Sequence, residues 1–231
     1  MQSEDRKKHY PTILEDRYGR YTLAKLIKKG AEADLYLIEW CGEKALKKIR
    51  APKLYLNRNI DKKIMTLRTA HEALFLLKAR CAGISTPLVY YVNPALGEII
   101  MQYVEGMRVK DILSEMSASE CKTTLRNIGR NIGLLHSSSI IHGDLTTSNF
   151  IITSSGKVVF IDFGLSYYSL RLEDKAVDLH LFSEVLKSVH GHRANIFIKH
   201  VFAGYSEIMG EPFLKTIMPR IQEISKRGRY A

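Results

Sequence analysis

The chain contains 231 residues, 45% of them hydrophobic, and its 35 Lys and Arg against 24 Asp and Glu give a formal net charge of +11 at pH 7. This length can bury a good core, either in one compact unit or in two small lobes. No run reaches the length of about 18 apolar residues that a membrane-spanning helix needs, and the three cysteines follow neither a metal-binding nor a disulfide pattern. We therefore expect no membrane segment, reduced thiols, and a location in the cytoplasm or the nucleus, with anionic partners favoured by the positive charge.

The chain begins with a charged segment, residues 1–20, which we expect to be mobile, and continues with a strand-rich region, residues 21–50. Residues 27–36 join two strand-like runs, at a place where a loop could cover the phosphates of a nucleotide. A full phosphate-covering loop has three glycines, whose backbone can approach phosphate closely, whereas this segment has only Gly30. Glu32 would repel phosphate unless it pairs with a lysine or faces a partner. The expected nucleotide contacts of this segment are Ile27, Gly30, Ala31, Glu32, Ala33 and Leu35.

The next two elements offer a lysine that could bind nucleotide phosphates and an acid that could hold this lysine. Lys47 lies in a strand-like run, and its amine would meet the phosphates as a point charge. Lys48 is the weaker candidate, because successive side chains of a strand point to opposite faces. After a basic connector at residues 51–63, residues 66–80 have helical apolar spacing and a single acid, Glu72. We predict an ion pair between Lys47 and Glu72; the alternatives are a surface lysine and a solvated helix face.

Residues 84–104 hold two more predicted strands, after which the chain becomes helical. Met101 and Tyr103 lie in a passage on which an adenine ring would hydrogen-bond to the backbone, although an ordinary core strand that ends at Gly106 would have the same pattern. Helical periodicity predicts helices at residues 111–117, 118–138, 175–189, 193–209 and 211–227.

Residues 142–162 carry the strongest functional signal: a His-Gly-Asp motif, an Asn five residues after its Asp, and an Asp-Phe-Gly motif that begins thirteen residues after the Asn. Two strand-like runs, residues 150–153 and 157–161, flank turn residues, so we expect an antiparallel hairpin. Asn149 enters this hairpin and Asp162 leaves it, so both lie at the same end of strands about 4.8 Å apart. An amide and a carboxylate there offer the hard oxygen ligands that Mg²⁺ prefers.

Asp144 lies five residues before Asn149, where it could orient the phosphoryl acceptor and take up its proton. Ile151, in the first strand of the hairpin, is a further expected contact of the nucleotide. Each polar residue alone could be a turn cap, but their joint spacing favours a phosphoryl-transfer centre that uses ATP and Mg²⁺.

The segment after this centre is unusually short. Only thirteen residues separate Gly164 from Asp178, and no Ala-Pro-Glu motif follows. Gly143 also stands where protein kinases have the arginine of His-Arg-Asp. The chain therefore has parts for phosphoryl transfer but little room to lay out a peptide substrate.

Further motifs complete the pattern: Gly-Ala-Glu-Ala at residues 30–33, Lys-Leu-Tyr at 53–55 followed by Asn-Ile-Asp at 59–61, and the stretches 82–87, 142–149, 162–166 and 173–178. Together they resemble the small atypical kinase subunit of the KEOPS (EKC) complex, also called the PRPK-type or piD-type kinase. The likeness covers about residues 22–229.

This resemblance implies a RIO-related α+β fold, which is a bilobal protein-kinase-like fold of reduced size. A strand-rich N-lobe would span about residues 21–103 and a helical C-lobe about residues 107–225, followed by a basic tail at 226–231. The implied activity is that of a Ser/Thr kinase and partner-activated ATPase with ATP and Mg²⁺ as cofactors. The implied partners are a Kae-type threonylcarbamoyl transferase and other KEOPS/EKC subunits, in the modification of tRNA adenosine.

The resemblance also implies roles for individual residues. By matching position, Lys47 and Glu72 would form the ion pair and Asp144 would be the catalytic acid, while Asn149 and Asp162 would bind the metal. Asp178 would brace the catalytic loop from below, although here the match is looser.

Two other functional classes stay open. A small-molecule phosphotransferase of the aminoglycoside or choline kinase type also has His-Gly-Asp and no peptide platform, but it leaves the motifs at residues 30–33 and 173–178 unexplained. A pseudokinase scaffold would only bridge partners and RNA, and the complete set of lysine and metal ligands argues against it. We expect tRNA contact through the assembly by the tail 226–231; the eight Lys and Arg of residues 44–63 are as well explained as solvated surface.

Overall fold

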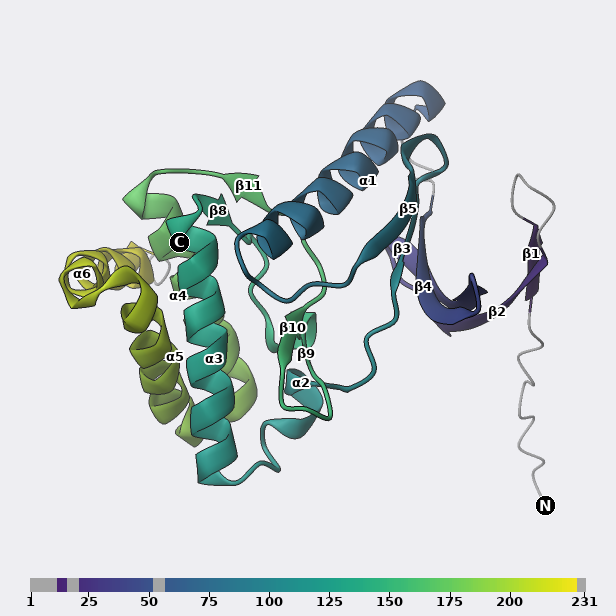
Figure 1. The fold of residues 1–231 in the computed structure, drawn as a ribbon. Coiled ribbons are helices and arrows are strands. Elements are labelled where there is room, and N and C mark those ends of the chain that lie inside the picture. The colour runs from purple at the N-terminus through teal and green to yellow at the C-terminus, as the bar shows by residue number, and fades with distance from the viewer. Residues whose placement is uncertain (1–11, 16–20, 52–56, 228–231) are drawn as a thin grey trace, which may run out of the picture. The chain divides into compact units, whose positions relative to one another are not determined.

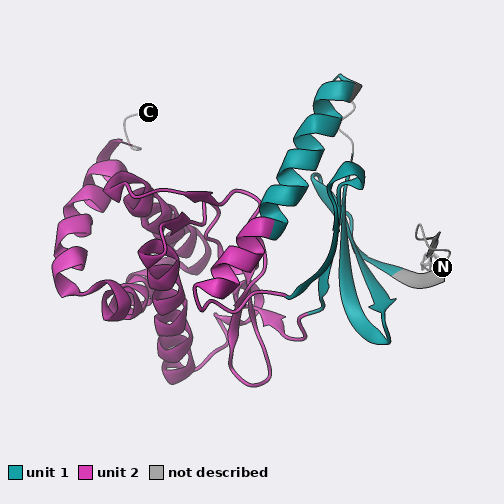
Figure 2. Cartoon of the chain, turned by 45° about the horizontal axis from the view of Figure 1, so that its top comes forward, with its two compact units in different colours: residues 1–73, 88–103 teal, residues 74–87, 104–231 magenta. Residues whose placement is uncertain are grey.

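The computed structural model describes residues 12–15, 21–51 and 57–227, and the chain divides into two compact units (Figures 1 and 2). Unit 1 comprises residues 1–73 and 88–103, and unit 2 comprises residues 74–87 and 104–231. Unit 1 contains a large sheet, whereas unit 2 is mostly helical. The predicted α+β organisation, with strands in the first part and helices in the second, is confirmed.

Unit 1 contains a six-stranded antiparallel sheet with the strand order β1-β2-β3-β4-β6-β5. The turn between β3 and β4 places Cys41 at φ 52° and Gly42 at φ 85°, which are left-handed conformations typical of a two-residue hairpin turn. β1 forms within the segment that we expected to be mobile. The strands are β1 (Thr12–Glu15), β2 (Tyr21–Lys28), β3 (Ala33–Trp40), β4 (Glu43–Arg50), β5 (Val89–Asn93) and β6 (Glu98–Gln102), with a 3₁₀ turn at Pro94–Leu96.

Helix α1 (Arg58–Cys81) begins well before residue 66, where its start was predicted. Asn57 explains this start: its side-chain oxygen accepts the backbone N–H of Asn59 at 2.9 Å, and its carbonyl accepts that of Asp61 at 2.9 Å. An Asn at this position satisfies N–H groups that the first helical turn leaves unpaired. The predicted connector at residues 51–63 is therefore wrong in its second half, and residues 52–56 lie outside the described residues.

Unit 2 combines helices with short strands. The predicted hairpin of β9 and β10 is confirmed, with Phe150 opposite Phe160 and Ile152 opposite Val158. Strand β7 extends this hairpin to three strands, and β8 pairs with β11; such two-residue strands have no periodicity that would predict them. The helices are α2 (Val109–Ile112), α3 (Ala118–Ser137), α4 (Leu172–His190), α5 (Ala194–Met209) and α6 (Glu211–Arg227). The strands are β7 (Met107–Arg108), β8 (Ile140–Ile141), β9 (Phe150–Ile152), β10 (Val158–Phe160) and β11 (Tyr167–Tyr168), with 3₁₀ turns at Thr147–Asn149 and Gly191–Arg193.

Two glycines let helices α3 and α5 lie side by side at very close range (Figure 1). A Cβ atom on Gly129 would lie 2.0 Å from the carbonyl oxygen of Val201, and one on Gly204 would lie 1.9 Å from that of Arg126. Such distances leave no room for any side chain, so the two helix backbones pack directly against each other. None of the described helices is long and apolar enough to cross a membrane.

This contact predicts that Gly204→Ala destabilises unit 2. The added methyl group must push the helices apart, which costs about 2 kcal/mol or more and should lower the Tm by about 4–8 °C. Thermal unfolding followed by circular dichroism measures the effect. Ala203→Ser, at an exposed position of the same helix, is the matched control, and an equal Tm for the two variants would contradict the proposed contact.

Candidate active site

Lys47 and Lys48 lie on opposite faces of the sheet of unit 1. Lys48 stands opposite Leu35 of β3, whereas Lys47 stands opposite Tyr36. Because partners across antiparallel strands point to the same face and residues two apart along a strand share a face, Arg50 lies on the face of Lys48.

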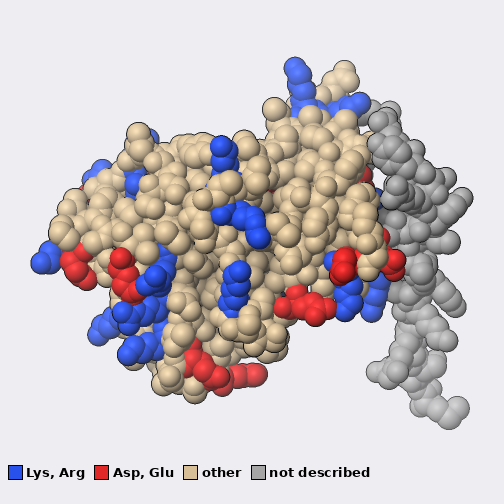
Figure 3. All heavy atoms as spheres, viewed as in Figure 1, with Lys and Arg blue, Asp and Glu red and all other residues tan. Residues whose placement is uncertain are grey.

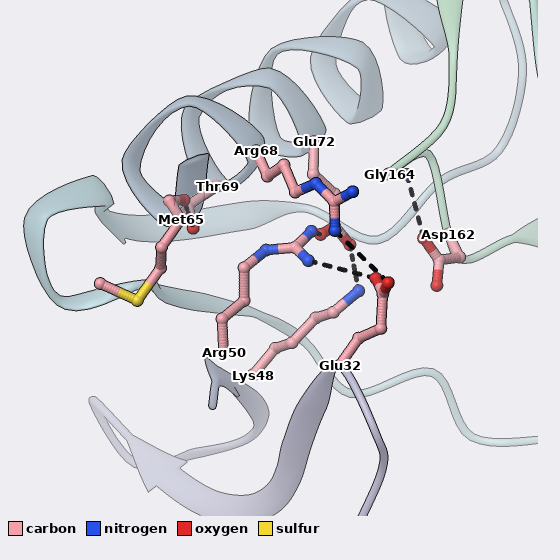
Figure 4. A network of polar contacts seen from close by, with 9 residues as sticks. All are labelled: Glu32, Lys48, Arg50, Met65, Arg68, Thr69, Glu72, Asp162 and Gly164. Atoms are coloured by element: carbon pink, nitrogen blue, oxygen red, sulfur yellow. Dashed lines mark hydrogen bonds and ion pairs between the residues drawn. The ribbon is translucent and has the colours of Figure 1, made fainter. Parts of the chain in front are cut away.

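The face of Lys48 carries a buried ion-pair network with helix α1 (Figure 4). Lys48 Nζ lies 2.5 Å from Glu72 Oε1, and Arg50 NH2 lies 2.6 Å from Glu72 Oε2. The Glu72 side chain is fully buried. A buried carboxylate is stable only when it is paired and hydrogen-bonded, and here each of its oxygens has its own cation.

The predicted ion pair between Lys47 and Glu72 is wrong. Lys47 instead pairs with Glu98 of β6, on the other face of the sheet. Alternation along the strand was expected, but the sequence does not tell which of the two faces meets the helix. Arg50 was missed, although its position two residues after Lys48 would have placed both cations on one face.

The segment that was expected to cover phosphates is the loop between β2 and β3. Gly30 is required there, because a Cβ atom on it would lie 2.6 Å from the carbonyl oxygen of Ala33. The sequence suggested a lysine as the partner of Glu32; the structure shows two arginines beside it, Arg68 at 3.3 Å and Arg50 at 3.7 Å.

The other residues expected to contact the nucleotide are spread along unit 1 and β9. Leu35 and Met101 both lie on the face of Lys48, since Met101 stands opposite Leu46. Met101 is buried, Ile27 and Ala31 are exposed, and Tyr103 and Ile151 are half-buried. Their contact with a nucleotide stays a prediction.

The β9–β10 hairpin of unit 2 positions Asn149 and Asp162. The backbone N–H of Ile161 donates to the carbonyl of Asn149 at 3.0 Å, which extends the ladder to the residue before β9. Asp162 follows directly, and its Oδ1 accepts the N–H of Gly164 at 3.0 Å (Figure 4). Both side chains therefore lie at one end of the hairpin, as the sequence predicted.

Asn149 also contacts Asp144. Its amide nitrogen donates to the carbonyl oxygen and to Oδ2 of Asp144, both at 2.9 Å. With the nitrogen used in this way, the amide oxygen is the Asn149 atom that would bind a metal. One amide oxygen and the carboxylate of Asp162 fit Mg²⁺, which takes a few hard oxygen ligands from the protein and the rest from water and phosphate.

Asp178, the seventh residue of α4 (Leu172–His190), holds the loop that precedes β9 by accepting two of its backbone N–H groups. Its Oδ2 accepts the N–H of His142 at 2.9 Å, and its Oδ1 accepts that of Gly143 at 3.0 Å. Gly143 has φ +78°, and a Cβ atom on it would lie 2.4 Å from the carbonyl oxygen of Leu165. This geometry explains why glycine stands where protein kinases have the arginine of His-Arg-Asp.

Two residues that the sequence analysis missed complete this buried cluster. His136 Nε2 lies 3.2 Å from Asp178 Oδ2, and its Nδ1 lies 2.9 Å from the hydroxyl of Tyr205. Burial opposes ionisation of Asp178, but the hydrogen bond and charge of His136 and the N–H of His142 hold the pKa of the carboxyl below its ordinary value. Burial lowers the pKa of His142, whose Nδ1 faces the N–H of Asp144 at 3.3 Å.

The first two residues of the predicted basic tail, residues 226–231, belong to a helix. Lys226 and Arg227 form the last turn of α6, and residues 228–231 lie outside the described residues. Arg227 pairs with Glu173 at 3.6 Å and with Glu223 at 4.0 Å. On the face shown in Figure 3, Lys and Arg form several small groups, many with Asp and Glu beside them, and not one broad basic area. RNA contact through this end of the chain stays a prediction.

Comparison with known proteins gives consistent matches. The protein kinase domain family matches residues 21–180. The chain is 41% identical to the KEOPS complex subunit Bud32 of Pyrococcus abyssi over 89% of this chain and 96% of that protein. It is 34% identical to the EKC/KEOPS complex subunit bud32 of Dictyostelium discoideum over 88% of this chain and 82% of that protein.

Two further matches are partial. A probable bifunctional tRNA threonylcarbamoyladenosine biosynthesis protein of Methanosarcina acetivorans is 36% identical over 99% of this chain, which spans only 40% of that protein. Among solved structures, the Rio2 kinase of Chaetomium thermophilum, in its ADP/Mg²⁺-phosphoaspartate complex, aligns with a TM-score of 0.59 at 14% identity, over 91% of this chain and 72% of that chain. At this identity the structural match shows the fold alone.

The two faces of β4 predict different effects of the two lysines on ATP turnover. Lys48→Met should lower turnover about 100-fold or more, as expected when a preorganised charge is lost, whereas Lys47→Met should stay within about threefold of wild type. Steady-state ATP turnover of the folded variants distinguishes them. The assignment fails if Lys47→Met is the inactive variant.

The low pKa values of His142 and Asp178 predict that acid destabilises the protein. Because the folded state keeps His142 neutral while the unfolded chain binds a proton below about pH 6.5, stability is lost as the pH falls below that value, and the contribution of Asp178 is lost at still lower pH. His142→Asn should flatten the dependence of the unfolding free energy on pH between 7 and 5. The exposed His192→Asn is the control, and equal pH profiles for both variants would argue against this origin.

Proposed function

Because the chain belongs to the protein kinase domain family and to the family of the KEOPS complex subunit Bud32, we propose that it transfers the γ-phosphoryl group of ATP as an atypical Ser/Thr kinase and partner-activated ATPase. One observation carries this proposal. The loop of residues 142–149 is held in a defined conformation, because Asp178 accepts the N–H groups of His142 and Gly143 while the amide of Asn149 donates to Asp144.

In this proposal each polar residue has a separate role. Lys48, oriented by Glu72, binds the phosphates of ATP. Asn149 and Asp162 bind Mg²⁺, which neutralises the charge that develops on the phosphates. Asp144 orients the acceptor, a hydroxyl or a water molecule, and accepts its proton. The amide of Asn149 keeps the Asp144 carboxylate in position for this proton transfer.

The short segment after Gly164 supports hydrolysis of ATP over phosphorylation of peptides. Only residues 165–171 separate Gly164 from helix α4, and two of them form β11, which pairs with β8. A peptide substrate has little backbone there to lie along. A partner protein is therefore the more suitable regulator or acceptor.

We further propose that the chain acts within a KEOPS/EKC assembly, with a Kae-type threonylcarbamoyl transferase, in the modification of tRNA adenosine. The support is that relatives named as KEOPS subunits match over most of their own length. A small-molecule phosphotransferase and a pseudokinase scaffold are not favoured by these matches. The free thiols of Cys41, Cys81 and Cys121 agree with a cytoplasmic or nuclear location.

The test is ATP turnover by the full chain alone, with a Kae-type partner, and with tRNA added. The partner should change the rate markedly. Asp162→Ala should lower the Mg²⁺-dependent rate of ATP turnover by several orders of magnitude. The lost metal ligand removes several kcal/mol of charge stabilisation, and each change of about 1.4 kcal/mol in the activation free energy changes the rate tenfold.

Three outcomes would overturn this function. Turnover of Asp162→Ala within tenfold of wild type would reject the metal site. Efficient phosphorylation of short peptides without any response to a partner would indicate a conventional kinase. Robust transfer to an aminosugar or an amino alcohol would indicate the small-molecule class.

A further inference from the structure

The ion pairs around Glu72 form part of a longer chain of alternating charges (Figure 4). From one end to the other it runs Lys48, Glu72, Arg50, Glu32 and Arg68, with distances of 2.5, 2.6, 3.7 and 3.3 Å between successive partners. It joins strand β4, helix α1 and the loop between β2 and β3, and all five residues belong to unit 1.

The two ends of this series of ion pairs differ in burial: Lys48, Glu72 and Arg50 are buried or nearly so, whereas Glu32 and Arg68 are exposed. The side chain of Glu72 is 0% exposed and that of Arg50 is 7% exposed, whereas Arg68 is 40% and Glu32 60% exposed. The buried end is therefore fixed, because separating it would leave a charge unpaired inside the protein. The exposed end is weak and open to screening by salt.

The loop between β2 and β3 is held by backbone hydrogen bonds as well as by the ion pairs of Glu32. The backbone carbonyl of Glu32 accepts the N–H of Ala51 at 3.3 Å, next to Arg50. On the other side of the loop, the N–H of Gly30 donates to Asp34 at 3.3 Å. The loop thus has its main chain held at both ends and its carboxylate directed at two arginines.

Arg50 joins Glu72 to Glu32 through different nitrogens of its guanidinium group. Its NH1 lies 3.7 Å from Glu32, which is an ion-pair distance and too long for a hydrogen bond. Its Nε is buried and has no hydrogen-bond partner among the described residues. A buried guanidinium nitrogen without a partner is costly, so the ion pairs that Arg50 makes with Glu72 and Glu32 are the described contacts that stabilise its charge.

We infer that Glu32 is a positioning residue for nucleotide binding. A loop with three glycines adapts its backbone to the phosphates, whereas this loop has one glycine and is held by charge. Through Arg50, the carboxylate that fixes the loop is tied to Glu72, which orients Lys48. The loop and the phosphate-binding lysine are therefore set by one network. This inference rests on the proposed use of ATP.

The test compares Glu32→Gln, Arg68→Gln and the double variant with wild type, as full chains with Mg²⁺ and ATP. Glu32→Gln should weaken ATP binding, measured by titration calorimetry, by about threefold to fivefold, the range expected for an exposed ion pair. The kcat for ATP turnover should change by less than about twofold, since no chemical group is lost. The double variant should bind no more weakly than Glu32→Gln, because both changes break the same pair.

The matched control is Glu98→Gln, which breaks the Lys47 pair on the other face of the same sheet and should leave ATP affinity unchanged. Raising the salt concentration should weaken ATP binding by wild type more than by Glu32→Gln, because only wild type has the pair to screen. Glu32→Gln should keep the wild-type Tm, which separates positioning from a merely structural role.

The inference is overturned if wild type and Glu32→Gln bind ATP equally, if the effects of Glu32→Gln and Arg68→Gln add, or if Glu98→Gln weakens binding as much. Lys48→Met shows whether such a result rejects only the role of Glu32 or also the proposed use of ATP. If wild type binds and turns over ATP and Lys48→Met does not, the proposed function stands and only the role of Glu32 is rejected. If wild type itself neither binds nor turns over ATP, both are rejected.

Discussion

The structure of unit 1 depends on keeping the Glu72 carboxylate charged without contact with water. Transfer of such a group into the protein interior costs several kcal/mol unless cations and hydrogen bonds replace its hydration. Strand β4 supplies two cations to it, Lys48 and Arg50, from positions two residues apart. A shift of β4 by one residue would turn both away from α1 at once, so this single carboxylate fixes the register of the strand.

Unit 2 also contains a buried carboxylate, that of Asp178, but different groups stabilise its charge. Asp178 is as deeply buried as Glu72, yet no Lys or Arg accounts for its low pKa. Two backbone N–H groups and His136 stabilise its charge instead. Two backbone N–H groups can point at one carboxylate only when the backbone that carries them has a defined conformation. Asp178 therefore fixes the backbone of the loop that carries Asp144, whereas Glu72 fixes the side chains of Lys48 and Arg50. A mutation of Asp178 would change the loop conformation, and a mutation of Glu72 would change the positions of those two side chains.

The sequence predicted those features that follow from local patterns. The hairpin between Asn149 and Asp162 was found because turn residues separate two apolar runs, and α6 was placed at its observed bounds by its periodicity. The partner of Glu72 was not found, because alternation along β4 separates Lys47 from Lys48 but leaves the choice of face to tertiary packing. His136 and Tyr205 were missed for a related reason: within an apolar helical pattern, nothing distinguishes a polar core residue with a buried partner from one at the surface.

The short connection between Gly164 and α4 has a consequence for how the activity can be controlled over time. Where a long segment is switched by phosphorylation, the mark persists after the kinase that added it has left, and a phosphatase must remove it. Here seven residues, two of them paired in β11, leave no such segment to carry the mark. Control by an associated subunit lasts only as long as the complex does. The rate of ATP turnover by this enzyme would then depend on the present concentrations of its partners and not on their earlier concentrations.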